Sequence, residues 1–236
     1  MFRITLASAT LALAAASVGA VPVSFTKLTG LTGGSPAGTA VYKADLTPLS
    51  LATILSISIR DSGSGSGGAP SQFSGFDLDA IKLSHANCAD ASCASAAAAL
   101  SVFDFGAGTL FTPGSQRPPP DPKLFGTNAL GTAIDNSVAT LGLFDANNTT
   151  AIPGAFGFVS LGDGGLVDFN LSAPVATSGL YLYIGEVGDN GEVASSDITV
   201  RDTAVPEPSG LALLAVALAG LAWSQRRQPR TARIQA

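Results

Sequence analysis

The chain has 236 residues, of which 17 are acidic and 12 basic, and its formal net charge is −5. All acidic residues precede position 209, so residues 21–208 carry seven basic and 17 acidic side chains, a net charge of −10. This charge argues against electrostatic binding of nucleic acid or anionic lipid by the central region. The negative charge is compatible with high solubility, with binding of cations, or with contact to a neutral or basic polymer.

Residues 1–20 predict a signal peptide. Arg3 gives a basic start, and residues 4–18 are apolar or small. Val18 and Ala20 occupy the −3 and −1 positions of a cleavage site before Val21. We expect export through the Sec translocon and cutting by signal peptidase after Ala20. A first transmembrane helix is the alternative, but the apolar run is short for one.

Residues 21–204 predict one all-β domain, a β-sandwich or jelly roll. Short apolar runs are separated by Gly, Asp, Asn and Pro, and no long amphipathic helix pattern is present. The segment is long enough for a single domain with its own core. The candidate strands are residues 21–28, 39–46, 51–60, 73–83, 101–105, 139–144, 155–161, 165–171, 179–187 and 196–201.

Alternation within these runs predicts which side chains face the core. In the run 51–60, Leu55, Ile57 and Ile59 share one face, with Ser56 and Ser58 on the other. In the run 73–83, Phe76, Leu78 and Ala80 share one face, with Asp77, Asp79 and Ile81 on the other. The runs 155–161 and 165–171 flank Gly-Asp-Gly and predict a β-hairpin.

Acidic residues in two places form a candidate calcium or glycan site. Asp77 and Asp79 would lie on one face of a strand, and calcium takes carboxylate oxygens as ligands. The acidic turn at 188–192 adds Asp189 and Glu192. A solvated strand face or a turn cap is the simpler explanation of Asp77 and Asp79, and the calcium site is the alternative.

The run 179–187 predicts a strand with two tyrosines beside its core residues. Leu180, Leu182 and Ile184 would face the core, whereas Tyr181 and Tyr183 would point outward or into a groove. Aromatic rings can pack on the apolar faces of sugars, so both tyrosines are candidate glycan contacts. Core or cross-strand packing is the favoured explanation of the two tyrosines, and glycan contact is the alternative.

Cys88 and Cys93 are the only cysteines. In an oxidising compartment such a pair predicts a local disulfide, which stabilises modestly because the closed loop is short. A metal site that also uses His85 and Asp90 is the alternative. It lacks the second Cys or His cluster that such sites usually have.

No catalytic motif is evident. The Gly- and Ser-rich loop at 61–68 lacks the Lys of a phosphate-binding loop and the Ser-centred elbow of a hydrolase. A glycan-active enzyme would need a carboxylate pair, drawn from Asp77, Asp79, Asp168 and Glu186, which the sequence cannot place in space. We therefore expect no enzymatic activity and no cofactor, unless calcium binds.

The end of the chain has three parts in a fixed order. Pro206, Glu207 and Pro208 come first, and the prolines prevent a helix from running back into the domain. An uncharged apolar run at about 209–224 predicts a transmembrane helix, although it is short for one. Arg226 and Arg227 follow and keep this end in the cytoplasm by the positive-inside rule.

These features resemble the PEP-CTERM sorting signal of Gram-negative bacteria that secrete exopolysaccharide. The resemblance covers residues 205–230 and leaves 231–236 as a cytoplasmic tail. It implies that an exosortase, a membrane transpeptidase or protease, processes the chain. Pro206, Glu207 and Pro208, with Arg226 and Arg227, are then recognised by that enzyme and are not an active site of this protein.

The predicted signals together indicate where in the cell the protein goes. We expect an exported protein that is held transiently in the inner membrane by its C-terminal helix and then reaches the cell surface or extracellular matrix. There it would be a non-catalytic structural or glycan-binding component of the exopolysaccharide matrix. The alternatives are a surface adhesion protein that binds another protein and a secreted glycan-active enzyme.

Overall fold

The structure is a computed structural model that describes residues 19–34, 38–65, 69–146, 157–192, 197–206 and 217–218. Its strands are β1 (Val21–Pro22), β2 (Thr26–Thr32), β3 (Thr39–Asp45), β4 (Thr53–Arg60), β5 (Asp77–Ser84), β6 (Thr109–Thr112), β7 (Val159–Ser160), β8 (Leu166–Ala176), β9 (Tyr181–Val187) and β10 (Asp197–Arg201). A 3-10 turn, η1 (Ser71–Phe73), and one short helix, α1 (Ala91–Ala96), accompany them in the described part of the chain.

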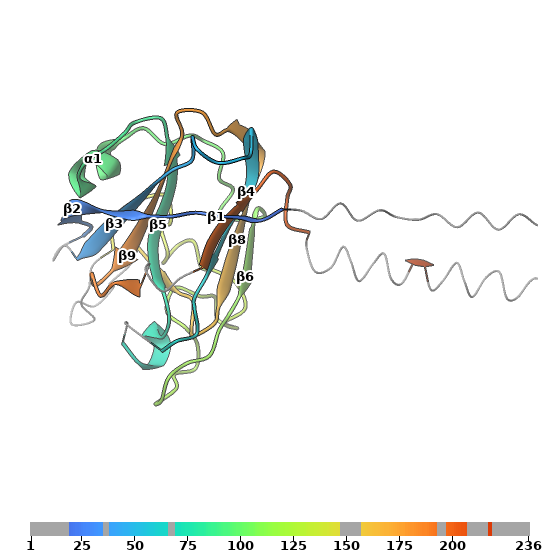
Figure 1. Ribbon diagram of the computed structural model, residues 1–236. Coiled ribbons are helices and arrows are strands. Elements are labelled where there is room, and N and C mark those ends of the chain that lie inside the picture. The colour runs from blue at the N-terminus through green and yellow to red at the C-terminus, as the bar shows by residue number, and fades with distance from the viewer. Residues whose placement is uncertain are drawn as a thin grey trace, which may run out of the picture.

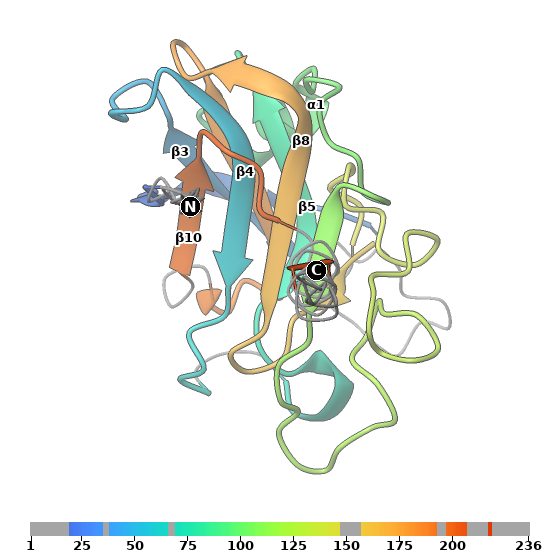
Figure 2. The same cartoon turned by 90° about the vertical axis from the view of Figure 1, so that its right-hand side faces the viewer.

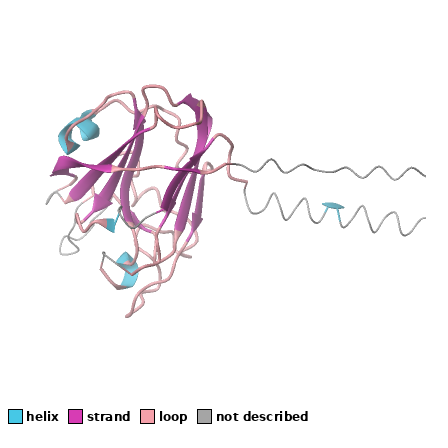
Figure 3. Ribbon diagram, viewed as in Figure 1, coloured by secondary structure: helices cyan, strands magenta, loops and turns pink. Residues whose placement is uncertain are grey.

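The described strands form two packed antiparallel sheets (Figure 1). Sheet A has the order β1-β10-β4-β8-β6, and sheet B has the order β2-β3-β9-β5-β7. Figure 3 shows that strands make up both layers and that α1 lies at the edge of one of them. The predicted β-sandwich is confirmed, and the alternating sequence explains it, because each strand can turn one apolar face inward.

The main core lies between the sheets. Ile57 and Ile59 of β4 and Phe169 of β8 face Leu182 and Ile184 of β9, and each is at most 1% exposed. Burying one such side chain contributes roughly 1.5–3 kcal/mol. Since the cluster draws on both sheets, it is the main source of the domain's stability.

A β-bulge in β5 changes which side chains face this core. Leu78 lies opposite Glu186 and Ile81 opposite Ile184, so two residues of β5 occupy the space of one residue of β9. Such a bulge reverses the alternation beyond it. Ile81 therefore joins the core and Ala80 faces the opposite layer. The faces predicted for Ala80 and Ile81 are wrong for this reason.

Two predicted strands and one predicted hairpin are also wrong. Residues 101–105 are loop with a single bridge from Phe103 to Leu171, and residues 139–144 form turns. The predicted hairpin does not form, because β7 pairs with β5 in sheet B while β8 pairs with β4 and β6 in sheet A. Residues 162–165 thus carry the chain from one sheet to the other.

The outer face of sheet B is covered by a second apolar layer that includes α1. Asp90 caps this helix by accepting a hydrogen bond from the backbone N of Cys93 at 2.7 Å. Cys88 and Cys93 form a disulfide with a Cα–Cα distance of 5.4 Å. The predicted disulfide is confirmed, and it leaves no thiol for a metal site. His85 instead contacts the carbonyl of Gly179 through Nδ1 at 2.9 Å.

Lys82 of β5 connects sheet B to α1 in the second apolar layer. Its Nζ donates to the carbonyl oxygens of Ala94, Ser95 and Ala97 at 2.9, 2.8 and 3.1 Å, and it lies 5.2 Å from the centre of the Phe144 ring. Burial lowers the pKa of Lys82. A cation at these carbonyls complements the end of α1, where backbone acceptors have no partners within the helix.

Lys82→Met should therefore destabilise the domain by about 2–4 kcal/mol, because three carbonyl groups, one buried and two half-buried, lose a charged donor while the apolar stem is kept. Urea unfolding at pH 7 measures this loss. Lys27→Met is the matched control. Lys27 forms a surface ion pair with Asp189, and its replacement should cost no more than about 1 kcal/mol. Equal losses in the two variants would show that Lys82 does not fasten the layer.

Candidate functional site

A cluster of buried carboxyl groups lies where β5 begins and β9 ends. The cluster consists of Asp77, Glu186 and Glu192, which are 6%, 0% and 1% exposed. Asp79 is 0% exposed and lies apart from them, beside Ala146 and Asp145. The sequence favoured either a solvated face or a calcium site for Asp77 and Asp79. The solvated face is wrong, because every residue of β5 is buried. Residues distant in the sequence cover these two acids: Ser160 and Glu192 contact Asp77, and Ala146 contacts Asp79.

Hydrogen bonds in the cluster use some of the carboxyl oxygens. Ser160 Oγ donates to Asp77 Oδ1 at 2.5 Å, and the backbone N of Asp77 donates to Glu192 Oε2 at 3.0 Å. Glu186 Oε1 accepts from the backbone N of Asn190 at 3.4 Å. Among the described residues, Glu186 Oε2 has no hydrogen-bond partner. Such an oxygen strongly disfavours the charged form of the acid.

The environment raises the pKa of each acid in the cluster and that of Asp79. Burial, and next the charge of Glu192, raise the pKa of Glu186 to about 8. Burial is also the main cause that raises the pKa of Glu192 to about 7 and that of Asp79 to about 7. Burial and then Glu192 hold the pKa of Asp77 well above its usual range. The cluster thus retains protons near neutral pH.

The predicted calcium ligands do not meet in one place. Asp189 forms its ion pair with Lys27, and Asp79 Oδ1 accepts from the backbone N of Ala146 at 3.1 Å. Within the described ranges, no three His, Cys, Asp or Glu side chains are arranged to hold a metal ion. Calcium binding by these residues stays a prediction, without a site in this part of the chain.

The two tyrosines of β9 have different surroundings. Tyr183 is fully buried under the outer layer of sheet B. Its hydroxyl accepts from the backbone N of Cys88 at 2.9 Å and donates to the carbonyl of Ala86. The ring is closed to a sugar in this structure. Tyr181 is half-buried, with Lys43 Nζ 5.8 Å from the ring centre, so its glycan contact stays a prediction.

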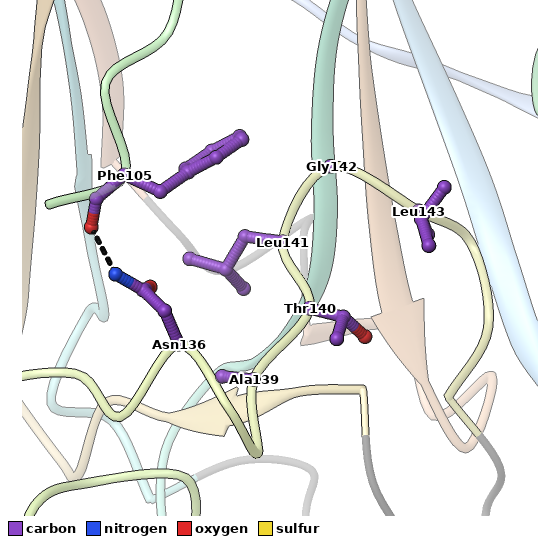
Figure 4. A pocket seen from close by; sticks show the side chains of 7 residues that line it. All are labelled: Phe105, Asn136, Ala139, Thr140, Leu141, Gly142 and Leu143. Carbon is purple, nitrogen blue, oxygen red and sulfur yellow. Dashed lines mark hydrogen bonds between the residues drawn. The ribbon is translucent and has the colours of Figure 1, made fainter.

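A pocket of about 220 Å³ opens between the loop that precedes β6 and the loop that connects β6 to β7 (Figure 4). It is lined by Phe105, Asn136, Ala139, Thr140, Leu141, Gly142 and Leu143. Asn136 Nδ2 donates to the carbonyl of Phe105 at 2.7 Å, which joins the two sides of the pocket. Stacking of Phe105 on Phe103, with ring centres 5.4 Å apart, holds the aromatic wall in place.

Sequence reasoning missed this pocket. The run 139–144 resembles a strand in its apolar content, and no motif marks a loop that folds over an aromatic ring. The close approach of Gly142 to Phe105 shows what the loop requires: a Cβ at position 142 would lie 3.3 Å from the Phe105 ring. The glycine was therefore the one available signal, although glycine in a loop has many causes.

A polar hollow of about 340 Å³ lies on the outer face of sheet A. Arg201 donates to Ser58 Oγ, which donates to Asp168 Oδ1. Ala20 and Val205 line the same hollow. The predicted signal-peptidase site and the start of the C-terminal tail therefore lie side by side on one face of the domain, which Figure 2 shows toward the viewer.

Residues 204–227 match the family model described as the PEP-CTERM protein-sorting motif. The chain carries a PEP-CTERM sorting signal. The match includes Pro206, Glu207 and Pro208 and reaches Arg227, as the sequence predicted. The PEP-CTERM signal implies processing by an exosortase, and with it export and sorting to the cell surface. No curated protein and no solved structure shows significant similarity to this chain.

Most of the PEP-CTERM signal lies outside the described residues, including Glu207, Pro208, Arg226 and Arg227. Of the predicted membrane span, the structure describes only residues 217–218, which are helical. Within the described part of the chain, no helix is long and apolar enough to cross a membrane. The transmembrane helix at 209–224 therefore stays a prediction, as does the signal peptide, whose residues 1–18 also lie outside.

Proposed function

We propose that this exosortase-sorted domain is a non-catalytic, glycan-binding component of the exopolysaccharide matrix. The PEP-CTERM signal supports the destination, since it directs the chain to the cell surface. The β-sandwich supports the structural role, because a rigid domain can present a binding surface on its loops.

The pocket in Figure 4 is the observation that carries the proposal. It combines the ring of Phe105 with the amide of Asn136 at its edge, whereas the hydroxyl of Thr140 donates to Asp145 Oδ1 at 2.6 Å. A sugar ring has one apolar face and a rim of hydroxyl groups, so it needs this mixture of apolar and polar contacts. Leu143, 60% exposed, extends the apolar wall to the surface.

The charge of the lining suggests which glycans fit. None of the lining residues is charged. An acidic or basic sugar would enter the pocket without a partner for its charge, which is unfavourable. The pocket therefore suits a polymer with neutral sugar units. The negative charge of residues 21–208 points the same way, since it repels an acidic polymer.

The environment of the carboxyl groups supports a non-catalytic role. Glycoside hydrolysis uses two carboxyl groups on either side of a bound sugar. Asp77, Asp79 and Glu186, which the sequence offered for such a pair, are buried. Asp168 is 7% exposed and accepts a hydrogen bond from Ser58. A polysaccharide could not reach the first three without a rearrangement of sheet B.

Leu143→Asp should weaken binding to the host's exopolysaccharide by about tenfold or more, because it places a charge on the apolar wall. Co-sedimentation of the processed protein with purified exopolysaccharide measures this. Leu130→Asp is the matched control, since Leu130 is 82% exposed and does not line the pocket. Equal binding by both variants would refute this pocket. Loss of cell adhesion with intact glycan binding would instead favour a protein partner.

A further inference from the structure

The chain does not leave the domain at the end of β10. After Arg201 it crosses the outer face of sheet A, passing over β4 and then β8 (Figure 2). We call residues 202–206 the exit strap. Ser56 Oγ of β4 donates to the carbonyl of Thr203 at 2.7 Å. Ser56 and Asn170 lie directly opposite each other in the pairing of β4 with β8, so both hold the strap at one level of the sheet.

Asn170 binds the strap at two points. Its Nδ2 donates to the carbonyl of Val205 at 3.0 Å, and its Oδ1 accepts from the backbone N of Val205 at 2.7 Å. A side-chain amide that uses both its donor and its acceptor on one residue imitates the pairing of a neighbouring strand. Both backbone groups of Val205 are thereby occupied, and Pro206, which follows, has no N–H to offer.

The strap overlaps the sorting signal, because the matched motif begins at residue 204 and so includes Val205. Enzymes that act on a peptide bond commonly bind the chain in extended form, through the backbone groups on both sides of that bond. While Asn170 holds Val205, the groups just before Pro206 are not free for such binding.

The strap also shortens the chain that connects the folded domain to the predicted membrane span. If the membrane span begins near residue 209, three residues separate Val205 from it, a length of roughly 10 Å when fully extended. Release of residues 202–205 would add roughly 14 Å. The folded domain thus stays close to the membrane surface as long as the strap is held, and an enzyme has little space around the Pro-Glu-Pro segment.

We propose that Asn170 is a positioning residue for sorting: it holds the first residues of the signal on the folded domain, and its release from Val205 precedes processing by the exosortase. The two hydrogen bonds correspond to a factor on the order of ten to a hundred in the population of the released form. The proposal depends on the sorting signal alone and is independent of glycan binding.

Asn170→Ala in the full-length chain should convert the membrane-bound precursor to the processed form several-fold faster than the wild-type chain, as followed by pulse–chase in the host. Hydrogen exchange of the Val205 amide should become faster, while the midpoint of thermal unfolding changes little. Asn128→Ala is the matched control, because Asn128 Oδ1 accepts from the backbone N of Thr132 within its own loop, remote in sequence from the strap. It should leave the processing rate unchanged.

A second variant lengthens the chain before the Pro-Glu-Pro segment and leaves Asn170 and the fold of the domain unchanged. A Gly-Ser-Gly-Ser insertion between Val205 and Pro206 supplies free chain without opening the strap, so it should also speed processing. Asn170→Ala should add nothing to it. Unchanged or slower processing in Asn170→Ala, with faster exchange at Val205, overturns the proposal. If Asn170→Ala does not fold, an insertion variant that is processed at the wild-type rate overturns it on its own.

Discussion

Replacement of Pro206, Glu207 and Pro208 by alanine should leave the protein uncut and in the membrane fraction. These residues belong to the matched sorting motif, and the enzyme that reads the motif acts only where it recognises it. Alanine also permits helix, so the apolar segment could extend backward into the motif and remove the extended chain. Because recognition is lost altogether, we expect nearly complete retention of the precursor, measured by immunoblotting of fractionated cells.

Three alanines in place of Pro118, Pro119 and Pro120 are the control. These prolines are exposed in a loop remote in sequence from the signal, so processing should proceed normally. Normal release of the Pro206–Pro208 variant would mean that the motif is not the substrate of the sorting enzyme.

The free energy of unfolding should fall as the pH rises from 5 to 8.5, by an amount on the order of 3 kcal/mol. The buried acids have pKa values of about 7 for Asp79 and Glu192 and about 8 for Glu186, above the ordinary values of 3.8 for Asp and 4.5 for Glu. Between these limits the native state holds more protons than the unfolded chain. Their stabilising effect is therefore complete in acid and is lost as the pH passes through 7–8.

Glu186→Gln should remove part of this dependence, because glutamine resembles the protonated acid. We expect it to raise stability at pH 8.5 by about 1–3 kcal/mol and to change little at pH 5. Thermal and urea unfolding at both pH values measure this. Asp135→Asn is the control, since hydrogen bonds from Ser137 lower the pKa of the exposed Asp135. A wild-type domain that is more stable at pH 8.5 than at pH 5 would contradict the account of the cluster.

The sandwich could be predicted because its main strands repeat a simple pattern. In β3, β4 and β9 apolar residues recur at every second position for several residues, which is sufficient to indicate a strand with one buried face. The bulge in β5 could not be predicted, because it depends on how β5 pairs with β9. The false hairpin has a similar cause: two β-prone runs with a glycine turn pair locally unless other strands compete for them, as β4 and β5 do here.

The candidate sites also differ in how well the sequence predicted them, according to whether their residues are close together in the chain. The disulfide and the sorting motif are local in sequence, and both predictions are confirmed. The exposed position expected for Asp77 and Asp79 was wrong, because residues far away in the sequence cover them. Ser160 and Glu192 contact Asp77, and Ala146 contacts Asp79. Asn170 reaches Val205 across 35 residues. Contacts of this kind follow from the fold and have no signature in a single sequence.

Calorimetric titration of the processed protein with the host's exopolysaccharide tests the central claim most directly. It should be carried out in calcium and in chelator. The account predicts saturable binding of similar strength in both, because the uncharged pocket at Phe105 and Leu143 needs no metal. Absence of saturable binding in both would contradict a glycan-binding role, and binding that is lost in chelator would contradict the pocket and direct attention to Asp189 and the acidic turn.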